Sequence, residues 1–213
     1  MSKRRHFRRI GIALLVLILS VSFLCLFSTS PSISPEMAFR RKEKENMIGP
    51  AEIIATLDFS YSGYDHILIG KSAYGYTFYE YRDAKLDDGK LTYVPKQKDA
   101  TLYCTYNRYG SEQSGEWLPI FAFVDTPKAH SARLVLTTTN KDGETANHSL
   151  ASMRNQQGYF LFQLHLIDLQ AEEYWLVQQL IAGNYREYAL KGTAEATLEL
   201  YDKNGNLLET YHF

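Results

Sequence analysis

The sequence has only two cysteines in 213 residues, and their positions exclude an internal disulfide framework. Cys25 lies inside an apolar run near the amino terminus, which leaves Cys104 alone in the rest of the chain. An exported domain without a disulfide is more typical of a bacterial cell envelope than of a eukaryotic secretory route. Free cysteine packs as a small hydrophobe, so we expect the Cys104 thiol to be buried in a core.

Catalytic and metal-binding motifs are missing as well. The six histidines are scattered and form no HExxH, HxH or Cys-His cluster, so we predict no metal site and no cofactor. Neither GxSxG nor SxxK occurs at a strand-to-helix turn, and the GKS that begins at Gly70 lacks the upstream glycine of a phosphate-binding loop. We therefore expect a protein that is not an enzyme.

An excess of positive charge is absent from residues 51–213. That range holds 14 Lys and Arg against 21 Asp and Glu, a net charge of about −7. Such a domain repels a polyanion, which excludes nucleic acid as a partner. A protein, a peptide or a glycan outside the membrane fits the charge better.

The amino terminus carries the clearest positive signal. Residues 1–9 form a basic tail with five Lys or Arg, and Ile10 to Phe27 is an uncharged apolar run of eighteen residues. At about 1.5 Å per residue this run just crosses a hydrocarbon core of about 30 Å. The leading positive charges orient the tail to the cytoplasm. We predict a single-pass signal anchor in the cell membrane with an extracytoplasmic C-terminal domain; the length of the run favours an uncleaved anchor over a cleaved signal.

The next segment, residues 28–50, reads as a linker or stalk. It is rich in serine and charge and poor in apolar residues, and it closes with Gly49 and Pro50. A short helix starting near Pro35 is expected within it. The basic group at 40–42 is interpreted as a solvated face, with contact to anionic headgroups or wall polymers as the alternative.

From Ala51 the pattern becomes that of short strands rich in β-branched and aromatic residues. DDGK at Asp87, NKDG at Asn140 and DKNGN at Asp202 read as tight turns between them, and the last does not match the spacing of a calcium loop. Short connections favour an antiparallel, all-β, sandwich-type fold. The eleven expected strands are IIATLDF, HILIG, YTFYEY, KLTYV, TLYCTY, WLPIFAFV, RLVLTTT, YFLFQLHL, YWLVQQLI, ATLELY and LLETYHF.

GSEQSGE at 110–116 is the best internal boundary. It separates a Tyr-rich β domain at 51–110 from a β-sandwich domain at 111–213, the latter of immunoglobulin-like size. Whether these are one domain or two is left open by the sequence.

The stretch IDLQAEEYWLV resembles the approach to a late strand in immunoglobulin-like sandwiches, with Tyr174 at the position of a tyrosine corner. The resemblance covers about ten residues. It lacks the cysteine pair and the core tryptophan of antibody domains, so it bears on the fold alone. The alternative for 168–182 is a helix that begins with Asp168 as N-cap and ends at Gly183.

Residues 74–81 read YGYTFYEY, five aromatics in eight residues. As a strand this segment carries Tyr74 and Tyr76 on one face and Tyr79 and Tyr81 on the other. Either both faces are covered, or one face displays aromatic rings to a sugar or a peptide. Tyr79 and Tyr81 are the first candidates for ligand binding, because their face also carries the small residues Gly75 and Thr77, between which a ring could lie flat. Tyr74 and Tyr76 are the second candidates.

These features predict a membrane-anchored, extracytoplasmic β-rich binding or interaction module of a bacterial cell envelope. The first alternative is an accessory or sensory subunit whose helix pairs with another membrane protein. The second is an envelope hydrolase whose residues assemble only in three dimensions.

Overall fold

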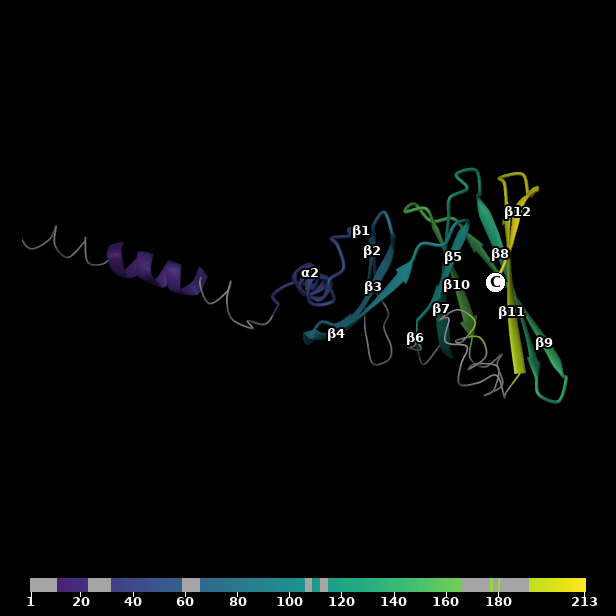
Figure 1. Ribbon diagram of the computed structural model, residues 1–213, viewed down its shortest axis with the longest axis horizontal. Coiled ribbons are helices and arrows are strands. Elements are labelled where there is room, and N and C mark those ends of the chain that lie inside the picture. The colour runs from purple at the N-terminus through teal and green to yellow at the C-terminus, as the bar shows by residue number, and fades with distance from the viewer. Residues whose placement is uncertain are drawn as a thin grey trace, which may run out of the picture.

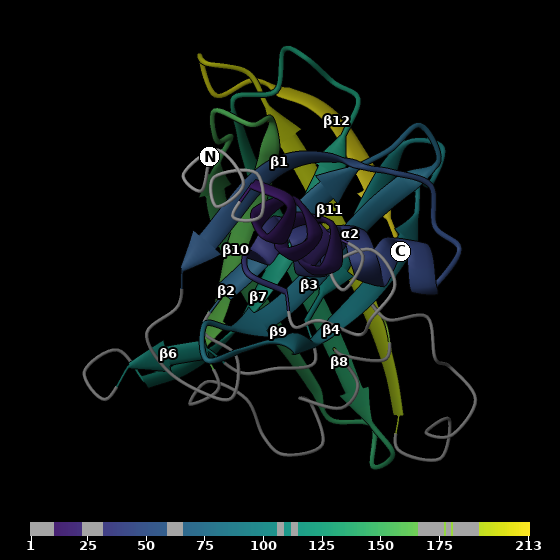
Figure 2. The same ribbon diagram turned by 90° about the vertical axis from the view of Figure 1, so that its left-hand side faces the viewer.

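The computed structural model describes residues 11–22, 32–58, 66–105, 109–111, 115–165, 177, 180 and 192–213. Within these ranges three antiparallel β-sheets are stacked, and a helix, α2 (Pro35–Glu45), covers the outer face of the first sheet (Figure 1). The predicted antiparallel, sandwich-type β architecture is confirmed. The turned view shows α2 lying across the strands of the first sheet (Figure 2).

The first sheet contains four strands that pair in sequence order, β1-β2-β3-β4. Every residue of β3 from Gly75 to Tyr81 is buried, which answers the question raised by YGYTFYEY: both faces of this strand are covered. The strands are β1 (Glu52–Asp58), β2 (His66–Lys71), β3 (Gly75–Arg82) and β4 (Lys85–Pro95).

The central sheet has the order β10-β7-β5, with β6 also paired to β7. The apolar run WLPIFAFV of β7 does not alternate with polar residues because other sheets cover both of its faces. Phe121 and Phe123 pack toward the first sheet, whereas Ile120 and Ala122 pack toward the third. The strands are β5 (Ala100–Cys104), β6 (Tyr109–Ser111), β7 (Gly115–Val124) and β10 (Tyr159–His165).

The terminal sheet has the order β12-β11-β8-β9 and forms the far layer. Its inner positions, such as Leu134 and Leu198, are fully buried, and the positions between them are more exposed. This alternation is that of a sheet with one covered face. The strands are β8 (Ser131–Asn140), β9 (Thr145–Met153), β11 (Gly192–Tyr201) and β12 (Leu207–His212).

Three hydrophobic clusters fill the spaces between the four layers. One packs Phe39 of α2 on Leu68, Tyr79 and Tyr81 of the first sheet. The second is aromatic and joins the first sheet to the central one. The third and largest lies between the central and terminal sheets and includes Cys104, which confirms the expected buried thiol.

Two of the three expected turns are confirmed. The turns after Asn140 and Asp202 connect β8 to β9 and β11 to β12, with Gly143 and Gly205 at φ values of +84° and +82° that favour glycine. The Asp202 carboxylate accepts hydrogen bonds from backbone N–H groups of its own turn.

The expected turn at DDGK is wrong, because Asp87 to Lys90 lies inside β4. Gly89 is required there for another reason: a Cβ atom built on it lies 2.5 Å from the Tyr79 ring. The glycine therefore makes room for an aromatic side chain of the neighbouring strand and does not form a turn.

Strand β9 was not expected. Its sequence, TANHSLASM, carries few β-branched or aromatic residues, and its exposed and half-exposed positions alternate at the edge of the terminal sheet. The pairing with β8, rather than intrinsic propensity, accounts for this strand.

The segment 28–50 is not a plain linker, because it contains α2 docked on the first sheet. The expected helix near Pro35 is confirmed, and the hydroxyl of its N-cap, Ser34, accepts a hydrogen bond from the N–H of Met37. Ala38 and Phe39 have no exposed surface. These two residues give the highly charged segment its apolar contact with the first sheet.

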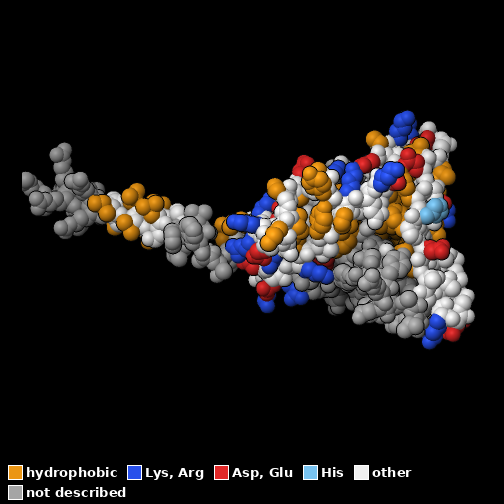
Figure 3. Space-filling view, viewed as in Figure 1, with side chains coloured by type: hydrophobic (Ala, Val, Ile, Leu, Met, Phe, Trp, Pro, Cys, Tyr) orange, Lys and Arg blue, Asp and Glu red, His pale blue; other side chains and the backbone are white. Residues whose placement is uncertain are grey.

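Residues 11–22 form a helix whose large apolar side chains are each more than half exposed (Figure 3). Among the residues that the structure describes, no helix meets the length and apolar content needed to span a bilayer.

The boundary at residue 110 stays a prediction, but strands on its two sides belong to one sheet, since β5 pairs with β7. The segment 168–182, for which the sequence left strand and helix open, lies outside the described residues except at two positions. Tyr174 is not among the described residues. Val177 and Leu180 have helical backbone and are buried in the largest cluster.

Candidate functional site

The four tyrosines proposed as ligand-binding residues lie in three different environments. Tyr79 and Tyr81 are buried beneath α2, with rings stacked at 5.5 Å between centroids. Tyr76 is buried between the first and central sheets, and Tyr74 is 81% exposed in the turn between β2 and β3. In this conformation only Tyr74 presents its ring to solvent.

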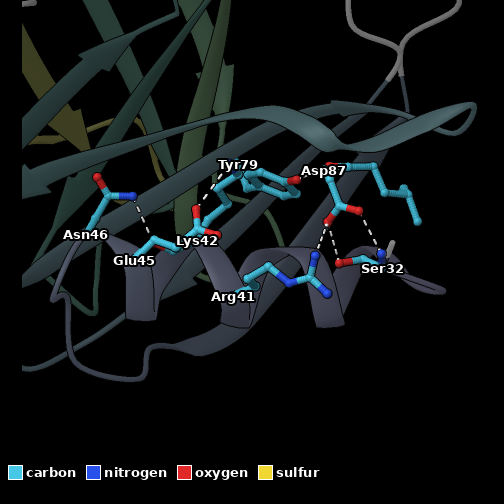
Figure 4. A network of polar contacts seen from close by, with 8 residues as sticks. Ser32, Arg41, Lys42, Glu45, Asn46, Tyr79 and Asp87 are labelled. Carbon is cyan, nitrogen blue, oxygen red and sulfur yellow. Dashed lines mark hydrogen bonds and ion pairs between the residues drawn. The ribbon is translucent and has the colours of Figure 1, made fainter. Parts of the chain in front are cut away.

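The α2 helix packs on Tyr79 and Tyr81, and polar contacts from Ser32 and Arg41 to Asp87 of β4 lie near Tyr79 (Figure 4). The Phe39 ring lies 6.2 Å from the Tyr79 ring, and the Tyr79 hydroxyl donates a hydrogen bond to the carbonyl of Leu86. Burial raises the pKa of Tyr81 to about 12. Both phenols are therefore neutral at physiological pH, and they serve the packing of the helix on the sheet.

Asp87 of β4 connects the first sheet to the chain just before α2. Its carboxylate accepts hydrogen bonds from the N–H and hydroxyl of Ser32, at 2.7 and 2.6 Å, and from Arg41 at 3.1 Å (Figure 4). Burial opposes its ionisation, but the bonds from Ser32 and the Arg41 charge outweigh burial and lower the pKa of Asp87.

Glu43 holds the other end of the helix segment. It is 2% exposed and accepts hydrogen bonds from the Ala51 N–H at 2.9 Å and from Arg40 at 2.7 Å. The basic group at 40–42 is thus not simply solvated: Arg40, Arg41 and Lys42 each have a carboxylate partner. A role for this group in binding anionic headgroups stays a prediction.

A pocket of about 190 Å³ lies at the junction of the first and central sheets. Tyr76 forms part of its wall and stacks on Phe123 with the ring centroids 3.8 Å apart. Burial raises the pKa of Tyr76. The pocket is lined by Ile54, Lys71, Tyr76, Phe123, Val124, Asp125, Pro127, Arg154, Gln157 and Gly158.

Three separate parts of the chain build this pocket. Lys71 and Tyr76 are paired across β2 and β3, on the two sides of the turn that carries the exposed Tyr74. Asp125 directly follows β7, and Arg154 lies in the connection from β9 to β10. Apart from Tyr76, these residues have no local signal in the sequence, because no fixed spacing relates them.

Two charged groups of the pocket have different kinds of partner, a lysine for Asp125 and backbone carbonyls for Arg154. Asp125 forms an ion pair of 2.6 Å with Lys96. Arg154 donates hydrogen bonds to the carbonyls of Thr126 at 2.7 Å, Ala129 at 3.4 Å and Gly158 at 3.1 Å. Arg154 therefore fixes the two loops at the mouth of the pocket with no carboxylate partner among the described residues.

One histidine between two aspartates, which sequence reasoning missed, lies at the first residue of β2. The His66 ring contacts Asp58 at 2.7 Å and Asp83 at 3.1 Å and stacks on Tyr81. Partial burial lowers its pKa, but the two carboxylates raise it by more, so the pKa of His66 lies above its ordinary value. Its sequence neighbour Asp65 is outside the described residues. The sequence feature that could have predicted the contact with Asp58 is the β1–β2 hairpin, which pairs His66 with Asp58.

Neither His66 nor His212 has both a carboxylate and a hydroxyl or thiol among its contacts with described residues. His66 has two carboxylates, and His212 lies 3.2 Å from the Thr197 hydroxyl. Burial raises the pKa of the Cys104 thiol, which disfavours the nucleophilic thiolate. The described part of the chain has no group of three or more His, Cys, Asp or Glu side chains placed to hold a metal ion.

No protein-family model matches the chain, and no curated protein or solved structure is significantly similar to it.

Proposed function

We propose that this protein is a membrane-anchored, extracytoplasmic binding module of a bacterial cell envelope, without catalytic activity. The observation that carries the proposal is the pocket at the junction of the first and central sheets. It brings charged side chains from separate parts of the chain to one small concave site with a mainly polar lining, beside the aromatic layer that joins the two sheets. Convergent polar groups in a concave site can fix the orientation of a ligand.

The anchor rests on the basic tail at 1–9 and the apolar run from Ile10 to Phe27. If Phe27 ends the anchor, only four residues separate it from Ser32, which is bonded to Asp87. Four extended residues reach about 14 Å. The docking of α2 thus replaces a long stalk with a short one, and the module would be held close to the membrane surface.

The residues that line the pocket support binding over catalysis. Among the described residues that line the pocket there is no histidine, serine or cysteine, and the lysine and arginine there are suited to recognition of a charged ligand. The hydrolase alternative has no assembled nucleophile and base among the described residues to support it.

The test places a photo-crosslinking amino acid at Gln157, which lines the pocket and is exposed. The matched control carries it at Lys141, an exposed residue in the turn between β8 and β9. Irradiation of native membranes should give a crosslinked envelope component from position 157 and not from position 141. Equal products from both positions, or none from 157, would contradict a binding role for the pocket.

The accessory-subunit alternative makes a different prediction. In that case the apolar run at 10–27 carries the recognition of another membrane protein. Exchanging this run for an unrelated apolar one should then abolish capture of the partner in a detergent pull-down. Retention of the same partner favours the binding module.

A further inference from the structure

The pocket between the first and central sheets contains cationic groups whose charge is not neutralised. Lys71 ends β2 with an exposed side chain, and no ion pair involves it among the described residues. Arg154 is half-buried, and within the part of the chain that the structure describes it is bonded only to backbone carbonyls. Carbonyl groups orient a guanidinium but do not cancel its charge, so both residues keep a full positive charge in the pocket wall.

The acidic residue of the pocket is already compensated. The Asp125 carboxylate lies 2.6 Å from the Lys96 ammonium, and Asp125 raises the pKa of that lysine, which keeps it protonated. With this pair neutral overall, the local charge comes from Lys71 and Arg154. The pocket lining thus holds two cations and one carboxylate, which is itself paired with Lys96, on a domain whose net charge is about −7. Glu52 lies opposite Lys71 on β1, but the two form no ion pair among the described residues.

Arg154 is also held in place before any ligand arrives. Its Nε and Nη1 atoms are engaged with the carbonyls of the two loops, and its Nη2 atom has no hydrogen-bond partner in the described part of the chain. Nη2 lies beside Gly158, another residue of the pocket wall, because a Cβ atom built on that glycine would be 3.6 Å from it. A donor fixed in advance lowers the entropic cost of binding.

We propose that this pocket binds one terminal oxyanion, a carboxylate or a phosphate, at the end of a neutral or cationic ligand. The inference rests on the proposed function of the pocket and names the chemistry that it recognises. Charge-assisted hydrogen bonds from Lys71 and from Nη2 of Arg154 hold the oxyanion, and the apolar walls of Ile54, Val124 and Pro127 hold the group that carries it.

Size and charge restrict the ligand further. A volume of about 190 Å³ is below the roughly 300–1,000 Å³ of sites that enclose a drug-sized molecule. Only one end of a larger ligand therefore enters. The negative field of the whole domain repels a polyanion, so the rest of the ligand is neutral or positively charged.

The experiment uses the full chain in a non-ionic detergent and ligand-observed NMR. The probes are N-acetyl-L-alanine, its uncharged amide and methyl phosphate. We expect the carboxylate to bind at least about tenfold more tightly than the amide, since an unpaired charged donor penalises a neutral ligand. Preference for methyl phosphate over N-acetyl-L-alanine would identify a phosphate as the natural oxyanion, and the reverse a carboxylate.

Two substitutions at the pocket should change the affinity for the anion in opposite directions. Lys71→Gln should weaken binding of the anion about fivefold to tenfold, whereas Asp125→Asn should strengthen it several-fold because it removes a negative charge. The matched control is Lys203→Gln, at an exposed lysine in the turn between β11 and β12 of the terminal sheet. It should leave the affinity unchanged.

The oxyanion assignment is overturned if the amide binds as well as the carboxylate, if neither anion binds, or if Lys71→Gln behaves like Lys203→Gln. Weaker binding of the anion in Asp125→Asn would also overturn it, because removal of a neighbouring carboxylate should favour a bound anion. Crosslinking from position 157 separates this failure from that of the proposed function. If the crosslink persists, the pocket binds a ligand of other chemistry; if it is absent as well, the binding role itself fails.

Discussion

Phe39→Ala tests whether α2 is an integral part of the β domain. Phe39 is fully buried against Tyr79, and a Cβ atom on Gly70 would lie 2.7 Å from its ring, so the ring fills its site closely. Phe→Ala substitutions at buried sites cost about 3–5 kcal/mol. We take about 3 kcal/mol, because α2 is an outer layer with room to relax. Each 1.4 kcal/mol is a factor of ten, so backbone amides of α2 should exchange roughly a hundredfold faster.

The assay is hydrogen exchange with mass spectrometry on the full chain in detergent, together with urea unfolding. Met37→Ala is the matched control on the same helix, because Met37 is 46% exposed and its loss should cost less than about 1 kcal/mol. Phe39→Ala should also lower the urea midpoint by about 1–2 M. Equal exchange rates in the two variants would refute the docking of α2 and restore the interpretation of 28–50 as a free linker.

Two further predictions concern the first sheet. Gly89→Ala should destabilise the protein by about 1–3 kcal/mol in urea unfolding, because its new methyl group meets the Tyr79 ring, whereas Gly49→Ala, in open space, should have little effect; equal effects would contradict the close packing. The raised pKa of His66 means that its interactions stabilise the fold fully below the unfolded pKa of about 6.5 and are lost as the pH rises through the folded value. His66→Gln should therefore cost more stability at pH 5.5 than at pH 9, by at most about 1 kcal/mol because both partner carboxylates are exposed; a loss independent of pH would contradict the ion pairs.

Local features of the sequence were sufficient to predict those elements whose conformation depends on neighbouring residues in the chain. The turns with Gly143 and Gly205 follow from backbone conformations that glycine adopts readily, and the apolar run WLPIFAFV forms a strand, β7, as expected. The same rule applied to Asp87 to Lys90 failed, because Gly89 serves packing against another strand. A turn signal cannot reveal which neighbour needs the space.

The environment of the tyrosines depended on tertiary contacts. Tyr79 and Tyr81 lie in a core and not on an open face because α2 covers them. The sequence gives little indication of this cover, since Phe39 and Ala38 are the apolar contacts of a segment that is otherwise charged. The pocket was beyond sequence reasoning for a similar reason. Lys71 and Arg154 come together only through the stacking of the first sheet on the central one.

The central claim is that the pocket at the junction of the first and central sheets is the binding site and that it selects an oxyanion. Its most direct test is the yield of the crosslink from position 157 in native membranes, measured with added N-acetyl-L-alanine or its amide. We predict that the carboxylate suppresses the crosslink in a dose-dependent manner and that the amide does not. Equal suppression by both compounds, or by neither, would contradict the account.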